Sequence, residues 1–265
     1  DVNEDLLRHM VLNSIRNNVK KFKKEFGQVV IACDSKNSWR YDVFPFYKAK
    51  RQDAKKQFNI DWDFVYSTFN KIIQELDEYF PYIVLKVDRC EADDIIGTLV
   101  HKHWSFILNE PILILSGDKD FLQLHRYTNV KQYSPIKKEW ITTPNPVYAL
   151  REHIMRGDRG DGIPNFLSSD NCFVVGERQK NIMTKKVEEW VKGGVNQFED
   201  PIMVKNYNRN DLLINLSKTP SDLQDKIYDE YKIKKQKSVV NNNGRLMEYF
   251  QLYKLKNLMS DIWDF

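Results

Sequence analysis

The chain has 265 residues, and its 41 Lys and Arg residues exceed its 37 Asp and Glu residues by only four. Hydrophobic residues make up 42% and charged residues 29%, a composition that buries an apolar core and excludes disordered and collagen-like classes. Apolar runs stop far short of the roughly 20 residues that a membrane helix needs, so we expect a soluble protein that does not act at a membrane. The three cysteines lack CxxC spacing, which is ordinary for a reducing cytoplasm and argues against a disulfide framework or a cysteine zinc site.

The N-terminal part of the chain alternates helices with short buried strands. Apolar residues at helical spacing indicate the helices, and short β-branched runs between polar residues indicate the strands. In chain order, the predicted elements are a helix over 5–26, a strand over 28–33, a helix over 61–80 with Asp61 as its N-cap, a strand over 82–87, a helix over 91–104, a strand over 112–115, and shorter strands over 130–134 and 139–143 that form an edge ribbon. This alternation favours a mostly parallel sheet flanked by helices, so the predicted fold class is α/β.

The pattern becomes entirely helical beyond residue 143. The helices predicted there lie near 146–156, 177–191, 207–217, 221–232 and 245–259. We therefore predict two domains, an α/β domain over 1–143 and an all-helical domain over 144–265. Within the first domain, residues 35–60 are basic and aromatic without sustained periodicity, which predicts a long functional loop.

Carboxylates cluster directly after the predicted strands. They are Asp34 after the first strand, Glu91 and Asp93 after the second, Asp118 and Asp120 after the third, and a further pair, Asp158 and Asp161, in the glycine-bounded turn GDRGDG. In an open parallel sheet, ligands bind outside the carboxyl ends of the strands. We therefore expect these acids to converge on one crevice, which the GDRGDG turn closes from the other side.

Such a cluster has a clear chemical use. Neighbouring carboxylates raise one another's pKa by repulsion, and hard divalent cations such as Mg²⁺, which prefer oxygen ligands, remove that repulsion. Two such ions about 4 Å apart can polarise a phosphodiester, generate hydroxide and hold the leaving oxygen. The cluster therefore predicts metal-dependent phosphodiester hydrolysis. Taken singly, each acid also has a simpler explanation, as a partner of a helix dipole, a turn residue or an ordinary loop residue.

A basic loop precedes most of these acids. Residues 36–56 contain seven Lys and Arg against two Asp, with five aromatic residues interleaved. Cations bind backbone phosphates, and aromatic faces stack on unpaired bases. The loop therefore predicts binding of single-stranded nucleic acid. The alternative is a solvated loop whose aromatic side chains pack on the core.

Five segments, in order, resemble the motifs of the flap endonuclease (5′ nuclease) superfamily. They are VVIACD, FYKAKR, VDRCEADDIIG, LILSGDKDFLQL and GDRGDGIPN, and the resemblance covers about residues 5–165. It implies a PIN-like α/β fold and an enzyme with two Mg²⁺ ions, for which Mn²⁺ substitutes. That enzyme removes RNA primers and 5′ flaps from DNA duplexes and RNA–DNA duplexes during replication, as 5′-to-3′ exonuclease, flap endonuclease and ribonuclease H. A sliding clamp and a single-stranded-DNA-binding protein are the partners it implies.

The resemblance also implies roles for individual residues. Asp34, Glu91, Asp93 and Asp118 would hold the first metal, and Asp120, Asp158 and Asp161 the second. Lys48 and Arg51 would be catalytic and meet the scissile phosphate. The predicted nucleic-acid-binding residues are Arg40, Tyr47, Lys48, Lys50 and Arg51. The helices over about 146–191 would grip the duplex backbone.

The start of the chain departs from the family pattern. The pattern opens with a strand that ends in an Asp metal ligand, whereas this sequence opens with DVNEDLL. We therefore expect either that a further strand precedes Asp1 or that the first metal site lacks one ligand. Two other functions remain open, a nucleic-acid-binding module of the same fold without catalysis, and a phosphatase for small phosphoesters, which would leave the basic loop unexplained.

Overall fold

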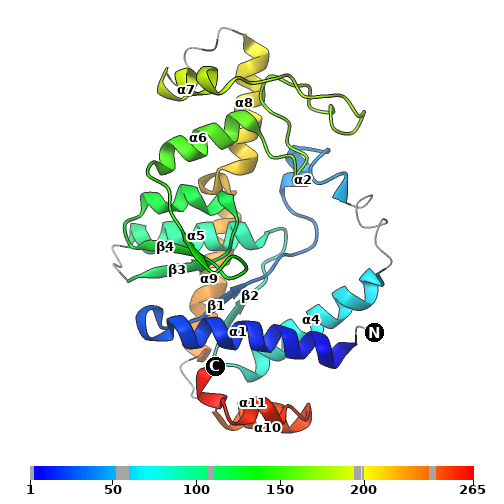
Figure 1. Ribbon diagram of the computed structural model, residues 1–265, viewed down its shortest axis with the longest axis vertical. Helices are drawn as coiled ribbons and strands as arrows, with labels where there is room; N and C mark the ends of the chain where they lie inside the picture. Colours follow the sequence, from blue (N-terminus) through cyan, green and yellow to red (C-terminus); the bar gives the residue numbers. More distant parts are fainter. Residues whose placement is uncertain (1–2, 52–59, 107–109, 194–197, 199, 239–242) are drawn as a thin grey trace. The chain divides into compact units, whose positions relative to one another are not determined.

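A computed structural model describes residues 3–51, 60–106, 110–193, 198, 200–238 and 243–265 (Figure 1). The chain divides into two compact units built from discontinuous segments. The first unit contains Asp1–Cys33, Ile60–Lys86 and Lys226–Phe265, and the second contains Asp34–Asn59 and Val87–Asp225. The predicted division after residue 143 does not coincide with this one, because the last strands and the helices that follow them pack within the same unit. No helix among the described residues combines the length and hydropathy required to cross a membrane.

The first unit packs helices around a two-stranded parallel sheet. Its elements are α1 (Glu4–Phe26), β1 (Val30–Ala32), α4 (Trp62–Tyr79), β2 (Ile83–Leu85), α10 (Asn243–Leu252), α11 (Lys256–Met259) and the 3₁₀ helix η4 (Ile262–Asp264). Val30 pairs with Ile83 and Ala32 with Leu85. Asp61 caps α4 as predicted, because its side chain accepts a hydrogen bond from the N–H of Phe64 at 2.9 Å. Helices α1, α4 and α10 bury their apolar faces in one core.

The second unit packs helices around a three-stranded sheet. Its elements are α2 (Arg40–Val43), α5 (Ala92–Ser105), β3 (Ile112–Leu115), η1 (Lys119–Arg126), β4 (Val130–Ser134), β5 (Glu139–Ile141), α6 (Pro146–Arg156), α7 (Thr184–Gly193), α8 (Pro201–Ile214) and η3 (Leu216–Lys218), and the division between the units falls within α9 (Ser221–Ser238). Strand β4 pairs in parallel with β3 and antiparallel with β5. Helix α6 packs against η1, α7 and α8 (Figure 1).

The α/β class is confirmed, but the strands do not form the single sheet that was predicted. In the described part of the chain, β1 pairs with β2, whereas β3 pairs with β4. The backbone groups of β3 thus find their partners in β4, which follows it after the short helix η1. Strand β4 is therefore central to its sheet and not part of a separate ribbon. The helix predicted over 177–191 begins only at Thr184, because residues 171–176 form turns with Gly176 at φ +77°.

Candidate metal and nucleic-acid site

All seven predicted metal ligands lie in the second unit. Two of them are positioned by hydrogen bonds at helix starts. Asp34 Oδ1 accepts a hydrogen bond from the N–H of Ala92 at 2.8 Å, which holds it beside the first turn of α5, where Glu91 and Asp93 lie. Asp118 is the N-cap of η1, and its side chain accepts a hydrogen bond from the N–H of Asp120 at 3.0 Å. The acids therefore also stabilise helix ends, as the simpler reading of the sequence suggested.

The GDRGDG turn has a compact backbone that only glycine allows at its ends. Gly157 has φ +69°, and a Cβ there would lie 2.4 Å from the carbonyl oxygen of Ile163. Asp158 Oδ1 accepts a hydrogen bond from the N–H of Asp161 at 3.1 Å. The N–H of Lys48 donates to the carbonyl of Asp161 at 2.8 Å, so the turn is fastened to the basic loop.

His153 of α6 lies between two of the predicted metal ligands. Its Nδ1 is 3.2 Å from Asp120 Oδ1, and its Nε2 is 3.1 Å from Asp158 Oδ2. Potential ligand atoms of these three residues all lie within 4.8 Å of one another, close enough for one cation to bind them. His153 was not predicted, because a single histidine on an amphipathic helix carries no spacing signal.

Burial and mutual repulsion raise the pKa of two of the acids. Burial, followed by the charges of Asp120 and Asp118, raises the pKa of Asp93 to about 8. Burial also raises the pKa of Asp120 to about 6, and neighbouring carboxylates add to this while His153 opposes it. Asp120 Oδ1 is buried and accepts no hydrogen bond from the described residues. The donor set therefore fits divalent cations, which would relieve the repulsion and bind this oxygen.

Asp158 has a different environment from its neighbours. Burial disfavours its charge, but hydrogen bonds from His153 and Lys119 outweigh this and hold the pKa of Asp158 well below its usual range. The Nζ of Lys119 lies 2.9 Å from Asp158 Oδ2. Asp158 is therefore ionised over the whole working pH range, as a metal ligand must be.

The basic loop contacts the remaining acids. Lys48 Nζ donates to Glu91 Oε1 and lies 3.9 Å from Asp161 Oδ2, and an Arg51 Nη donates to Asp161 Oδ1 at 2.6 Å. The hydroxyl of Tyr47 lies 2.7 Å from Glu91 Oε2 and 2.9 Å from Asp161 Oδ2, so it sits between the two carboxylates and can donate its one proton to either. Lys48, which was predicted to be catalytic, and Tyr47 thus link Glu91 and Asp161, whereas Arg51 contacts Asp161.

Two predicted nucleic-acid contacts require correction. Arg40 is only 3% exposed, and its guanidinium donates to both oxygens of Asp94, at 2.8 and 2.9 Å, and to the carbonyl of Leu213. Tyr47 is 2% exposed, and its ring belongs to the apolar core. Both side chains are therefore buried and make their contacts inside the protein. Arg40 is paired with Asp94, because a buried charge without a partner is costly. Lys50 and Arg51 remain exposed, and Lys48 is partly exposed.

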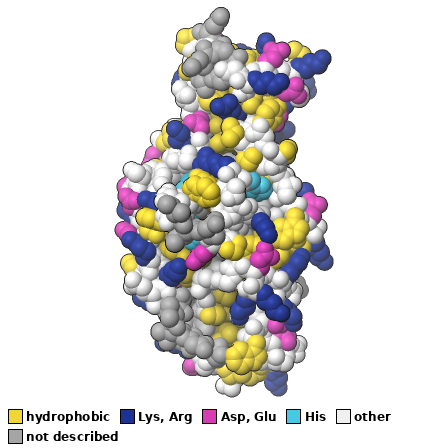
Figure 2. Space-filling model, turned by 90° about the vertical axis from the view of Figure 1, so that its left-hand side faces the viewer, with side chains coloured by type: hydrophobic (Ala, Val, Ile, Leu, Met, Phe, Trp, Pro, Cys, Tyr) yellow, Lys and Arg dark blue, Asp and Glu magenta, His cyan; other side chains and the backbone are white. Residues whose placement is uncertain are grey.

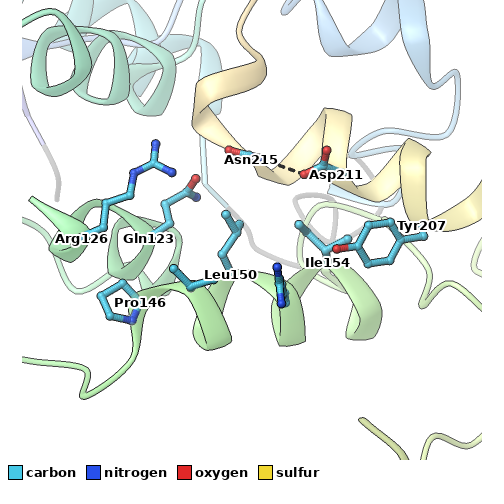
Figure 3. A pocket seen from close by; sticks show the side chains of 10 residues that line it. Gln123, Arg126, Pro146, Leu150, Ile154, Tyr207, Asp211 and Asn215 are labelled. Atoms are coloured by element: carbon cyan, nitrogen blue, oxygen red, sulfur yellow. Dashed lines mark hydrogen bonds between the residues drawn. The ribbon is translucent and has the colours of Figure 1, made fainter. Parts of the chain in front are cut away.

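The surface has two other features, a mixed distribution of charge and a small cavity. Basic side chains are interspersed with acidic and hydrophobic ones on the face drawn in Figure 2. A cavity of about 160 Å³ lies between η1, α6 and α8 (Figure 3). Its lining includes Gln123 and Arg126 of η1, Leu150 of α6 and Tyr207 of α8. The predicted site residues do not line this cavity, so it is separate from the candidate metal site.

Comparison with known proteins defines the class. Residues 7–150 match the family described as 5′-3′ exonuclease, N-terminal resolvase-like domain. The chain therefore belongs to the 5′-3′ exonuclease family, which confirms the predicted family. The ribonuclease H of Enterobacteria phage T4 is 34% identical over 278 residues, which cover all of this chain and 88% of that protein. A 5′-3′ exonuclease of Buchnera aphidicola is 29% identical over 163 residues, 58% of this chain and 53% of that protein.

Solved structures confirm the fold class. The phage T5 D15 protein co-crystallised with metal ions has a TM-score of 0.62 at 16% identity, and the match covers 83% of this chain and 91% of that one. A complex of the T5 D15 flap endonuclease with DNA and metal ions also gives a TM-score of 0.62. At such low identity, the likeness shows that the fold is shared.

Proposed function

We propose that this protein is a Mg²⁺-dependent, structure-specific 5′ nuclease that removes RNA primers and 5′ flaps during phage DNA replication. The observation that carries the proposal is the group of acids around Asp93, Asp118 and Asp120, in which burial and mutual repulsion raise the pKa of Asp93 and Asp120 although Arg40 and His153 oppose it. Membership of the 5′-3′ exonuclease family supports the reaction class.

The seven carboxylates would bind two divalent cations. The first would take Asp34, Glu91, Asp93 and Asp118, and the second Asp120, Asp158 and Asp161, with His153 beside it. Bound cations would activate water and neutralise charge on the phosphodiester. Mg²⁺ suits an all-oxygen set, and Mn²⁺ tolerates an added imidazole, so we expect Mn²⁺ to substitute. Structures of the T5 5′-exonuclease with divalent metal ions support the class of cofactor.

The chain's own groups would position the substrate. Lys48 and Arg51 lie at the carboxylates and can donate to the oxygens of the transferring phosphate, where they would stabilise its developing charge. Tyr47 bridges Glu91 and Asp161, so it holds these acids in place and does not contact substrate itself. Lys119 and His153 orient Asp158.

The substrates would be DNA and RNA–DNA duplexes with 5′ ends or flaps. Helices α6 to α8 would hold the duplex backbone, and a T5 flap endonuclease complex with DNA supports a DNA substrate. We also propose a sliding clamp and a single-stranded-DNA-binding protein as partners, on the basis of the family alone.

A substrate series tests the proposal. The wild-type protein is incubated with Mg²⁺ and labelled 5′-flap, 3′-flap and RNA–DNA duplexes, and with a small aryl phosphate. We expect cleavage of the 5′-flap and RNA–DNA duplexes and an uncut 3′-flap duplex. Tight binding without cleavage would instead identify a binding module, and hydrolysis of the aryl phosphate alone would identify a phosphatase.

A further inference from the structure

A second cavity in the second unit is lined by cations. Its volume is about 260 Å³, and its lining residues are Lys50, Arg159, Phe173, Gly176, Glu177, Arg178 and Gln179. Three cations and one carboxylate give it a formal charge of +2. Among the described residues, the side chains of Lys50, Arg159 and Arg178 form no ion pair with a carboxylate. This contrasts with Lys48 and Arg51, which are both paired with acids.

Asp170, which lies between Arg159 and Arg178 in the sequence, does not offset the positive charge of the cavity. Asp170 is paired with Arg209, which also donates to the carbonyl of Pro164 at 3.1 Å. Asp170 does not line the cavity. Like charges around one hollow repel each other, and a bound anion removes that repulsion, just as cations would for the acids of the metal site.

The segment that carries Phe173 and Arg178 is held in place by hydrogen bonds. The N–H of Asn165 donates to Gln179 Oε1 at 2.6 Å, and its side-chain amide donates to the carbonyl of Lys180 at 2.8 Å. The N–H of Glu177 donates to the carbonyl of Cys172, a buried residue, at 2.8 Å. The turn that carries Phe173 and Arg178 is thus fixed at both ends, so a ligand meets a preorganised site.

The cavity borders the candidate metal site along the chain. Arg159 lies inside the GDRGDG turn, between Asp158 and Asp161. Lys50 adjoins Arg51, whose guanidinium contacts Asp161. Arg159 and Lys50 of the cavity are therefore neighbours in the sequence of residues proposed to act at the scissile phosphate.

We propose that this cavity binds one unpaired nucleotide of the substrate strand, adjacent to the scissile phosphate. Lys50, Arg159 and Arg178 hold its phosphate, and its base stacks on the ring of Phe173. The inference rests on the proposed nuclease function and assigns Phe173, Arg159 and Arg178 as substrate-binding residues.

A charge variant tests the phosphate contact. Arg178→Gln is compared with Lys137→Gln, a matched control because Lys137 is an exposed cation of the same unit that lies outside the helices proposed to hold the duplex and does not line the cavity. The KM for a 5′-flap duplex is measured over a range of salt concentrations. We expect Arg178→Gln to raise KM and to lower the slope of log KM against log salt by about 0.7, the value for one phosphate contact on a single strand. Equal behaviour of the two variants overturns the phosphate contact.

Variants of Phe173 test the base contact. We expect Phe173→Leu to raise KM at least about fivefold, which corresponds to about 1 kcal/mol for one stacked base, and Phe173→Tyr, which keeps the ring, to restore the wild-type value. Flaps with a single abasic nucleotide at successive positions near the cut identify the stacked base. The effect of Phe173→Leu on KM should vanish when the abasic nucleotide is at the position whose base stacks on Phe173. A free nucleotide bound in the cavity would not give an effect that depends on position in the flap.

The outcomes separate the two proposals. If the wild type cuts no flap substrate, the nuclease function fails and the inference fails with it. If the wild type cuts flaps but Phe173→Leu has the same effect on every abasic substrate, or Phe173→Tyr matches Phe173→Leu, the inference alone is overturned.

Discussion

Two groups of buried charge, one in each unit, differ in how far the chain compensates them. In the first unit, Arg8 is 1% exposed and donates to both oxygens of Glu75 at 2.9 Å, and the hydroxyl of Tyr249 adds a bond at 2.8 Å. Burial opposes the ionisation of Glu75, but hydrogen bonds from Arg8, Tyr249 and Tyr253 outweigh it and lower its pKa. This network satisfies itself, which is what a structural ion pair requires.

In the second unit, by contrast, Asp93 and Asp120 have raised pKa values and gather against other acids. Folding brings these carboxylates together, and the cations near them do not fully offset the effects of burial and repulsion on their pKa values. The difference teaches that a buried acid whose raised pKa shows incomplete compensation is a signal of function, whereas a fully paired charge is not by itself one. The following predictions test that distinction, from the largest expected effect to the smallest.

Replacing one acid of the metal site should abolish cleavage. We expect Asp118→Asn or Asp120→Asn to reduce the rate of 5′-flap cleavage by about a thousandfold or more, because a bound metal supplies several kcal/mol of charge stabilisation. Duplex binding should be largely retained. Cleavage by either variant at the wild-type rate would refute the metal assignment.

Removing one partner of the structural pair should affect stability and not catalysis. We expect Arg8→Met to lower the free energy of unfolding by about 3–5 kcal/mol, because it leaves Glu75 buried without its cation. Lys71→Met is the matched control, because Lys71 is half exposed in its ion pair with Glu4 and should contribute no more than about 1 kcal/mol. Urea unfolding measures both values, and equal losses would contradict the assignment. The cleavage rate per folded molecule should not change.

Lys48 should matter for the chemical step. We expect Lys48→Ala to slow cleavage by about 10- to 100-fold, because one charged donor at the phosphate is lost, and to weaken the salt dependence of binding. Lys137→Ala, at an exposed lysine near Glu139, serves as the control. An unchanged cleavage rate in Lys48→Ala would contradict the catalytic role of Lys48 and indicate that the basic loop is only a solvated surface loop.

The uncompensated acids should make the metal-free protein sensitive to pH. The folded-state pKa values of about 8 for Asp93 and about 6 for Asp120 lie above the ordinary value near 4, so the folded state binds more protons than the unfolded state in this window. Stability should therefore fall as pH rises from about 4 to 8. Millimolar Mg²⁺ should raise the melting temperature by several degrees at the upper end. A melting temperature independent of both pH and Mg²⁺ would contradict this account.

The sequence predicted local elements better than their assembly. The spacing in α1 and α4 and the apolar run of β3 were sufficient, because each depends on its own residues. The separation into two sheets depends on strand pairing across long stretches of chain, which periodicity does not encode. The short 3₁₀ helix η1 was also missed, because it depends on the cap at Asp118.

The site was predictable to a similar extent. Acids after strands and around the GDRGDG glycines could be found by position, and they lie in one unit. The pairing of Arg40 with Asp94 could not be read from a basic loop, because it depends on which side chain the fold buries. The same holds for His153, which only the packing of α6 brings to Asp120 and Asp158.

Crystals of the wild-type protein soaked in Mn²⁺ would test the central claim most directly, because the anomalous signal locates the metal. The account predicts two peaks within coordination distance of the acids, one near Asp93 and Asp118 and one near Asp120 and Asp158. An occupied Mn²⁺ site elsewhere, with these carboxylates free of metal in a protein that cuts 5′ flaps, would contradict it.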